Sequence, residues 1–225
     1  MKTERTLVKT PWDSKVFGFD TYEVQAISRK SLEKAARLKG HFTVKLDPSR
    51  PNKLLRKYGF YYCDTLVKPF CTERQFKFFK NKKAALDRTA DVDDLVAISH
   101  GAFHGRFHRD FNIKKPLADL RYDNWLRELY KKHGAFGLMY GNKLAGFFAF
   151  SGNTICLHAL GKKYRGKGLA KYLWSVALRE LFNMGHRELV SSISTFNVPV
   201  LNLYSSLGFR FREPLDIYHR FTGRN

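Results

Sequence analysis

The chain has 225 residues, of which 44% are hydrophobic, enough for one large domain or two small ones. The 27% of charged residues excludes a disordered chain, and the absence of an apolar stretch near the roughly 20 residues of a membrane helix excludes a membrane span. No apolar run follows the first charged residues, so we expect no secretory signal.

Lysine and arginine number 41 against 20 acidic residues, which gives a formal net charge of +21. Such a charge attracts polyanions such as nucleic acid, anionic membranes or phosphorylated small molecules. The basic residues are spread along the chain, which disfavours nucleic-acid binding and is also compatible with ordinary solvated faces. The cysteines Cys63, Cys71 and Cys156 form no CxxC pair, which predicts reduced thiols in a cytoplasmic protein, with neither a disulfide framework nor a zinc site.

The first eighty residues predict a small α+β domain, followed by a basic connector that reaches residue 83. Ser31 suits a helix N-cap, Gly40 suits the left-handed position after that helix, and Pro51 favours the start of a second helix. A turn is expected at Pro11-Trp12-Asp13. The expected strands are 4–9, 15–27, 42–46 and 60–70, and the expected helices are 31–39 and 52–58.

Residues 84–225 predict a larger domain with the element order β-α-α-β-β-β-α-β-α-β-β. An apolar stripe supports its second helix. A Gly141-Asn142 turn supports its first hairpin. The expected strands are 84–89, 135–140, 144–151, 154–160, 188–194, 209–212 and 216–221. One helix is expected to begin at residue 90, and three more are expected over 116–132, 168–184 and 198–207. This order predicts an α+β fold with a mixed, mostly antiparallel sheet flanked by helices.

The segment with the strongest chemical signal is the turn between the strand 154–160 and the helix that follows it. The spacing Arg165-x-x-Gly168-x-Ala170 places two residues without bulky side chains at a helix N-terminus, where backbone N–H groups can bind a pyrophosphate. Lys162, Lys163, Arg165 and Lys167 add positive charge. The turn lacks the Gly-Lys-Ser/Thr of a P-loop and the GxGxxG of a dinucleotide fold, and an ordinary tight turn with a solvated basic face is the alternative.

A second element lies downstream, where Asn197 precedes Tyr204 and the sequence Leu207-Gly208-Phe209. A phenol with a pKa of about 10 can give its proton to a departing thiolate. The alternative is a core tyrosine that packs beside Leu203 and Leu207 on one helix face.

Taken together in this order, the two elements resemble the GNAT superfamily of acyl-CoA N-acyltransferases over about residues 84–225. The resemblance implies that main-chain amides of the turn bind the coenzyme A pyrophosphate and that the strand ending at Leu160 pairs with the pantetheine arm, which Asn197 also contacts. It further implies that Tyr204 is the general acid for the thiolate. The coenzyme residues so implied are Leu160, Lys163, Tyr164, Arg165, Gly166, Lys167, Gly168, Leu169, Ala170 and Asn197.

A carboxylate base is missing at the end of the strand 154–160. His158 is the nearest titratable side chain on that strand, and a histidine with a pKa near 6.5 can accept a proton from an amine, directly or through water. A structural histidine is the alternative.

The N-terminal part carries Trp12-Asp13-Ser14 and Lys57-Tyr58-Gly59-Phe60 ahead of the acyltransferase domain. Tyr58-Gly59-Phe60 is similar to Leu207-Gly208-Phe209, as expected for a degenerate internal copy. With the segment 103–110, Ala118-Asp119 and Trp125, this arrangement resembles the bacterial dTDP-fucosamine (dTDP-4-amino-4,6-dideoxygalactose) acetyltransferase group. The resemblance implies a truncated GNAT-like domain over 1–80 and a catalytic GNAT domain over 84–225.

The segment 103–110 lies where the superfamily builds its acceptor pocket, so Arg106, His108, Arg109 and Asp110 are the predicted substrate-binding residues. Arginine suits a diphosphate because it binds phosphate oxygens in pairs. A plain structural loop is one alternative. Metal binding by His100, His104 and His108, four residues apart, is another, but Gly101 and Gly105 weaken that helix and we expect no metal.

We expect an acetyl-CoA-dependent N-acetyltransferase in which the amine attacks the thioester directly, a strand amide near Leu160 polarises the carbonyl oxygen and Tyr204 protonates the sulfur. Cys156 is not expected to act as a nucleophile. The expected acceptor is a nucleotide-linked amino sugar, because a basic protein attracts an anionic acceptor. A protein, peptide or aminoglycoside amine is the alternative within the class, and a non-catalytic nucleic-acid binder the alternative outside it. A homodimer is compatible with the sequence.

Overall fold

The structure is a computed structural model that describes residues 6–223, and it separates into two compact units. Unit 1 consists of Met1–Leu66, His104–Arg121 and Glu213–Asn225, and unit 2 consists of Val67–Phe103 and Tyr122–Arg212. The units therefore alternate along the chain, unlike the expected division into 1–80 and 84–225. The assignment of a truncated and a catalytic domain to those two ranges stays a prediction.

Unit 1 is an α+β unit in which the strands follow the order β1-β2-β3-β11. The β2–β3 pair is parallel, while β1–β2 and β3–β11 are antiparallel, so the sheet is mixed as predicted. Its elements are β1 (Leu7–Lys9), α1 (Pro11–Phe17), β2 (Thr21–Val24), α2 (Arg29–Arg37), β3 (Gly40–Leu46), α3 (Lys53–Lys57), the first half of β4 (Tyr61–Thr72), the 3-10 turn η1 (Arg106–Arg109), the start of α5 (Lys115–Lys131) and most of β11 (Arg210–Thr222).

The predicted strand over 15–27 is wrong at its start, because a helix occupies these residues. Pro11 stands in the first helical turn, where its fixed φ is favourable, and Gly18 ends α1 at φ 76° with its N–H bonded to the Ser14 carbonyl. Only Thr21–Val24 of that range is a strand. The first residues of the predicted strand 4–9 lie outside the described residues.

Strands β2 and β3 have one apolar and one polar face. Phe42, Val44 and Leu46 alternate along β3 and pack against Leu32 of α2 and Leu55 of α3 in a core of their own. Burying each such side chain contributes about 1.5–3 kcal/mol. The intervening residues, His41, Thr43 and Lys45, point to the opposite face.

The N-cap of α2 lies three residues earlier than expected. Ser28, not Ser31, is its N-cap, and the two serines form a capping box in which each side chain accepts a hydrogen bond from the backbone N–H of the other. Ser31 is therefore the N3 residue of the helix.

Unit 2 contains the strand order β4-β9-β8-β7-β6-β5, with one parallel pair, β8–β9. Its elements are the second half of β4, β5 (Ala84–Asp87), α4 (Val92–Ser99), the rest of α5, β6 (Ala135–Tyr140), β7 (Lys143–Ser151), β8 (Thr154–Leu160), the 3-10 turn η2 (Lys162–Tyr164), α6 (Ala170–Asn183), β9 (Glu188–Ser191), β10 (Ile193–Ser194), α7 (Val198–Ser206) and the start of β11. The α+β class with a mixed sheet is confirmed.

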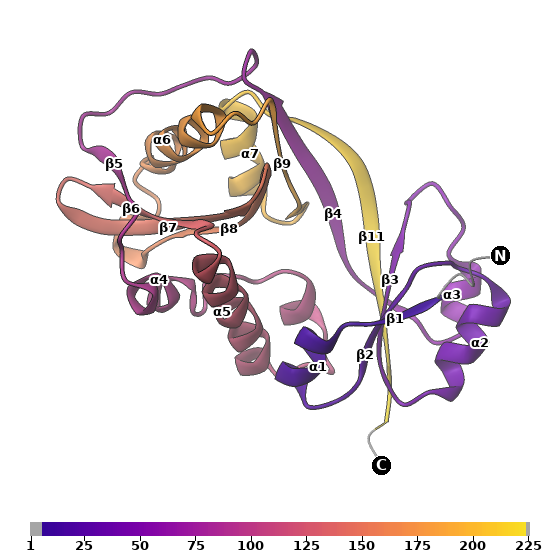
Figure 1. Ribbon diagram of the computed structural model, residues 1–225. Coiled ribbons are helices and arrows are strands. Elements are labelled where there is room, and N and C mark those ends of the chain that lie inside the picture. Colours follow the sequence, from indigo (N-terminus) through magenta and orange to yellow (C-terminus); the bar gives the residue numbers. More distant parts are fainter. Residues whose placement is uncertain (1–5, 224–225) are drawn as a thin grey trace. The chain divides into compact units, whose positions relative to one another are not determined.

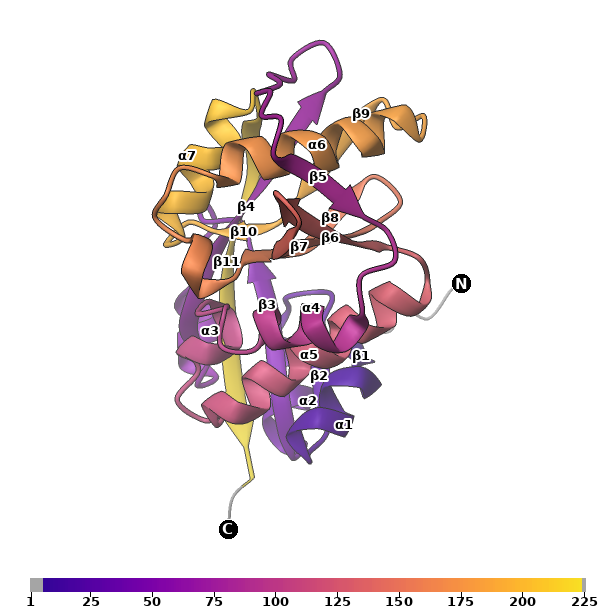
Figure 2. The same cartoon turned by 90° about the vertical axis from the view of Figure 1, so that its left-hand side faces the viewer.

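Helices cover both faces of the unit 2 sheet, with α6 and α7 on one face and α4 on the other (Figure 1 and Figure 2). Alternate residues of β7 enter different cores. Phe147 and Ala149 pack with Leu157 and with side chains of α4 and α5, whereas Phe148 and Phe150 pack with side chains of α6 and α7. This double burial explains the nearly continuous apolar sequence of β7.

Two strand predictions differ from the structure in detail. The expected strand 188–194 is interrupted at Ser192 and forms β9 and β10. The two expected terminal strands form one element, β11, in which Glu213 has a φ of 53° just before Pro214. The local distortion accommodates the proline without ending the strand. Among the described residues, no helix is long and apolar enough to cross a membrane.

Candidate functional site

Strands β8 and β9 form a fork in unit 2. Their parallel register joins Thr154 to Val190 and Ile155 to Ser191, and within residues 6–223 it continues no further. The Ser191 hydroxyl donates a 3.0 Å hydrogen bond to the Ile155 carbonyl where the strands part. Beyond this point β8 runs on to Leu160 with β7 as its strand neighbour, so the other edge of residues 156–160 can accept an extended ligand.

The turn after β8 presents free backbone donors. Gly166 and Gly168 have φ angles of 72° and 67°, a conformation that glycine adopts at little cost, and a Cβ at either position would meet nothing within 4 Å. In the described part of the chain, the N–H groups of residues 166–169 donate to no backbone acceptor in the turns and loops. Successive amides at the start of α6 can bind an anion, whose negative charge the helix dipole favours.

Arg165 is anchored beside this anion site. Its Nε donates a 2.7 Å hydrogen bond to the Leu160 carbonyl, which ties the turn to the end of β8. Lys162, Lys163 and Lys167 are exposed around it, and Tyr164 and Leu169 are partly buried against the core. The predicted coenzyme residues 160 and 163–170 therefore lie together in one segment of unit 2.

Half-buried His158 and buried Tyr204 form a pair below the fork. Nε2 of His158 lies 3.0 Å from the Tyr204 hydroxyl, and the tautomer of the histidine decides which atom donates. Burial lowers the pKa of His158 to about 4 and raises the pKa of Tyr204 above its ordinary value. At neutral pH the imidazole is therefore uncharged and the phenol keeps its proton.

Both side chains lie among aromatic rings. The His158 ring lies 4.9 Å from that of Trp174, and the Tyr204 ring 4.7 Å from that of Phe209. Tyr204 has no exposed surface and belongs to the core beside Leu207. This position agrees with the alternative in which Tyr204 is a core residue. Its catalytic role and that of His158 stay predictions.

Asn197 is exposed and is the N-cap of α7. Its side-chain oxygen accepts a hydrogen bond from the Val200 N–H at 3.4 Å. Its contact with the pantetheine arm stays a prediction.

The predicted acceptor residues lie in unit 1, on and beside η1. Arg106 takes a left-handed φ of 44°, and its backbone N–H donates to the buried carboxylate of Asp64 at 2.7 Å. Nε2 of His108 lies 2.8 Å from Asp119, and Nε of Arg109 donates to the Cys63 carbonyl at 2.9 Å. These internal contacts give the segment structural roles, and its contact with a substrate stays a prediction.

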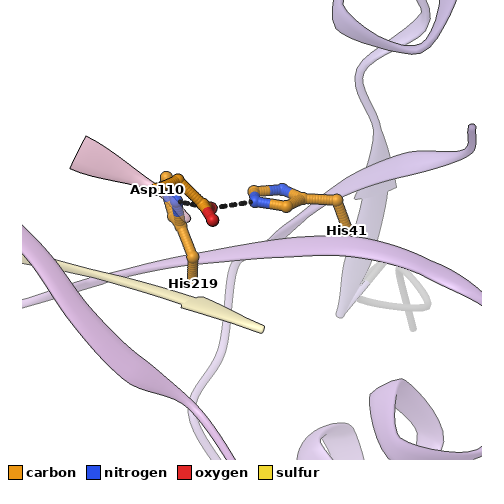
Figure 3. A group of neighbouring side chains, drawn as sticks. All are labelled: His41, Asp110 and His219. Carbon is orange, nitrogen blue, oxygen red and sulfur yellow. Dashed lines mark hydrogen bonds and ion pairs between the residues drawn. The ribbon is translucent and has the colours of Figure 1, made fainter. Parts of the chain in front are cut away.

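Asp110 is 2% exposed and is the centre of a hydrogen-bond cluster (Figure 3). Its Oδ2 lies 2.8 Å from Nε2 of His41 and 2.7 Å from Nδ1 of His219, while its Oδ1 accepts from the Tyr61 hydroxyl at 2.8 Å and from the Asn112 N–H at 2.8 Å. These bonds hold the pKa of Asp110 below its usual range despite its burial, and burial lowers the pKa of His219 to about 3.

The metal alternative of the sequence, His100 with His104 and His108, is not assembled. His100 pairs with Asp123 in unit 2, and His108 pairs with Asp119 in unit 1. Among the described residues, the group that could hold an ion is His41, Asp110 and His219, whose ligand atoms lie within 4.8 Å of one another. Their separations of 2.7 and 2.8 Å are those of hydrogen bonds, and the expectation of no metal stays untested.

Comparison with known proteins identifies the fold around the fork. Residues 102–209 match the model of the Acetyltransferase (GNAT) family. This segment is similar to the GNAT acetyltransferase family. No curated protein matches the sequence.

Solved structures extend the likeness to nearly the whole chain. A functionally unknown conserved protein from Staphylococcus epidermidis is 11% identical, with a TM-score of 0.63 over 98% of this chain and 93% of that one. A GCN5-related N-acetyltransferase from Sphaerobacter thermophilus is 10% identical, with a TM-score of 0.58 over 96% and 75%. A tandem GNAT protein from the clavulanic acid biosynthesis pathway is 12% identical, with a TM-score of 0.56 over 91% and 76%. At these identities the likeness shows the GNAT fold, and the narrower dTDP-fucosamine resemblance has no support.

The GNAT family uses acetyl-CoA, and the fork with its open amides has the features that a thioester carrier with a pyrophosphate requires. Sequence reasoning found this site because its parts are adjacent in the chain. It missed the cluster of His41, Asp110 and His219, because these residues are far apart in sequence and their spacing matches no known motif.

Proposed function

We propose that the protein transfers an acetyl group from acetyl-CoA to a primary amine carried by an anionic small molecule, such as a nucleotide-linked amino sugar. The observation that carries the proposal is the run of free backbone N–H groups at residues 166–169 directly after the open edge of β8. The family match supports acetyl transfer to an amine, and the net charge of +21 supports an anionic acceptor.

Each part of the site has a distinct task. The amides of residues 166–169 bind the pyrophosphate, and the free edge of residues 156–160 binds the amide groups of the pantetheine arm. The acceptor nitrogen attacks the thioester carbonyl, whose developing negative charge a backbone amide near Leu160 stabilises. The C–S bond breaks, and the acetyl group passes to nitrogen without a covalent enzyme intermediate.

Tyr204 supplies the proton that the leaving sulfur takes. Because burial raises the pKa of Tyr204, the phenol is protonated across the neutral range, as a general acid must be. The acceptor nitrogen loses its proton to solvent or to the neutral His158. The imidazole of His158 is hydrogen-bonded to the phenol of Tyr204. Since Tyr204 is closed off in the free protein, its contact with the sulfur requires the arm to enter the fork.

The direct test is a panel of amines assayed by the release of free thiol from acetyl-CoA. It contains nucleotide-linked 4-amino and 3-amino sugars, an aminoglycoside and a lysine peptide. Acetylation of a nucleotide sugar in preference to the cationic amines supports the proposal. Acetyl-CoA binding without turnover of any anionic amine would overturn the acceptor class, and the absence of acetyl-CoA binding would overturn the function as a whole.

A further inference from the structure

Unit 1 contains a cavity of about 200 Å³ on the polar face of β2 and β3. The parallel register places Thr21 beside His41 and Glu23 beside Thr43, so these side chains share one face and form the floor. Thr43 is 5% exposed and His41 1% exposed. A polar strand face that is covered rather than solvated is expensive to bury unless its polar groups are hydrogen-bonded.

The lining carries a net positive charge. Lys45 lies 3.1 Å from Glu23 and Nε of Arg121 lies 3.0 Å from Asp13, so both acidic groups of the lining already have a cation beside them. Arg106 is a third cation. The lining side chains comprise three cations and two carboxylates, and two further carboxylates, Asp64 and Asp110, contact the lining residues Arg106 and His41. The guanidinium of Arg106 is the lining group that suits an anion.

Two guanidinium groups converge on this cavity. The guanidinium carbon of Arg106 lies 4.3 Å and that of Arg121 lies 5.3 Å from the centre of the same ring, Phe107, which also lines the cavity. The backbone of Arg106 is held at a positive φ by the buried Asp64. Non-glycine residues held in this strained region gather at ligand sites, and a guanidinium suits the paired oxygens of a carboxylate or phosphate.

The uncharged part of the lining favours hydroxyl groups on the ligand. Asp110 is a carboxylate that accepts from Nε2 of His41, so the remaining nitrogen of this imidazole, Nδ1, is a hydrogen-bond acceptor when the ring is neutral. Thr43 adds a hydroxyl that can donate or accept. The indole of Trp12, 63% exposed, borders the cavity.

We propose that this cavity of unit 1 binds a small hydroxylated organic anion, with its carboxylate or phosphate on Arg106 and Lys45 and its hydroxyl groups on His41 and Thr43. The volume lies below the roughly 300 Å³ at which pockets for drug-sized ligands begin, so the ligand is of the size of a three-carbon acid or phosphate ester. The inference goes beyond the proposed acetyl transfer and does not rest on it.

The test is a titration of the full-length, ¹⁵N-labelled protein at constant ionic strength, observed at the indole N–H of Trp12. The signal is assigned by its loss in Trp12→Phe. Three matched probes are glycerate, glycerol 3-phosphate and glycerol, which share a carbon skeleton and differ in the charged group. Saturable shifts with either anion and none with glycerol support the site, and the tighter anion identifies its charged group as carboxylate or phosphate.

The variants Arg106→Gln and Lys45→Gln are each expected to weaken the bound anion about tenfold or more, as expected for the loss of a charge-assisted hydrogen bond. The matched control Arg29→Gln removes the same charge from an exposed helix position outside the cavity and should leave the affinity unchanged. If Arg106→Gln unfolds, Lys45→Gln, at the exposed rim, decides the question.

Equal binding of glycerol and the anions, equal weakening by Arg29→Gln, or shifts that never saturate would each overturn the proposal. The thermal midpoint with acetyl-CoA is recorded on the same samples. Because that readout reports on the turn in unit 2, a failure of the cavity is distinguishable from a failure of the acetyltransferase function.

Discussion

Nε2 of His158 and the hydroxyl oxygen of Tyr204 lie 3.0 Å apart, although 46 residues separate them in the chain. The strand β8 supplies one group and the helix α7 supplies the other. The pair joins the fork's free strand to the helix that follows β9 and β10, and it places a protonated phenol beside a neutral imidazole. A proton donor and a proton acceptor are thus held in one hydrogen bond.

Replacing Tyr204 by Phe is expected to lower kcat about a hundredfold or more, because the leaving thiolate loses its proton donor. The KM for acetyl-CoA should change little, since the coenzyme is bound by backbone groups of another segment. Steady-state kinetics by thiol release, with acetyl-CoA affinity measured by calorimetry, separates the two effects. The control is Tyr130→Phe, on α5 of the same unit, which should keep full activity. Unchanged turnover in Tyr204→Phe would leave this tyrosine a core residue only.

Replacing Gly168 by Ala is expected to weaken acetyl-CoA binding about tenfold. The left-handed backbone costs a non-glycine residue about 1–2 kcal/mol, so the turn that presents the amides is strained in the variant. Calorimetric titration with acetyl-CoA measures the change. Gly152→Ala is a matched control, because Gly152 has a φ of 56° and open space around it but lies in the β7–β8 turn. Equal affinity losses in the two variants would contradict the site.

The parts of the fold that sequence predicted are those fixed by local pattern. The bounds 154–160 of β8 were predicted in full, since alternation and flanking turns define them, and the 135–140 and 144–151 hairpin follows from its Gly141-Asn142 turn. The helix α1 was missed because Pro11 was interpreted as a turn residue, although it stands equally well in a first helical turn.

The parts that could not be predicted depend on contacts between distant segments. Alternation along β3 indicates a strand with a solvated polar face, yet His41 and Thr43 are buried because residues from η1 and α1 cover them. Asp110 was predicted as a substrate ligand because the segment 103–110 lies where the GNAT superfamily builds its acceptor pocket. Its partners His41 and His219 lie on strands 69 residues before it and 109 residues after it, so no local sequence pattern indicates them.

Acidification below about pH 6.5 is expected to destabilise the protein progressively. The folded-state pKa is about 4 for His158 and about 3 for His219, while an unfolded histidine titrates near 6.5. Between the folded and unfolded pKa values, the unfolded chain binds protons that the folded chain does not. The free energy of unfolding therefore increases as pH rises and decreases as pH falls. Each histidine adds up to about 1.4 kcal/mol per pH unit.

Urea unfolding at several pH values from 7 to 4.5 measures this slope. In His158→Gln one of the two imidazoles with a lowered pKa is absent, so the slope should become shallower, whatever the variant's stability at pH 7. A slope that His158→Gln leaves untouched would show that His158 does not stay neutral in the folded protein.

Replacing Asp110 by Asn is expected to lower the free energy of unfolding by about 3 kcal/mol, because four donors converge on its buried carboxylate. The amide that replaces Oδ2 or Oδ1 is itself a donor, so at least one imidazole or the Tyr61 hydroxyl faces an N–H group instead of an acceptor. Asp119→Asn is the matched control, since Asp119 is bonded to the single imidazole of His108 and is more exposed; its loss should be about 1 kcal/mol. Urea unfolding at pH 7 compares the two. Similar losses in both variants would mean that the cluster around Asp110 stabilises unit 1 no more than one ordinary histidine–carboxylate bond does.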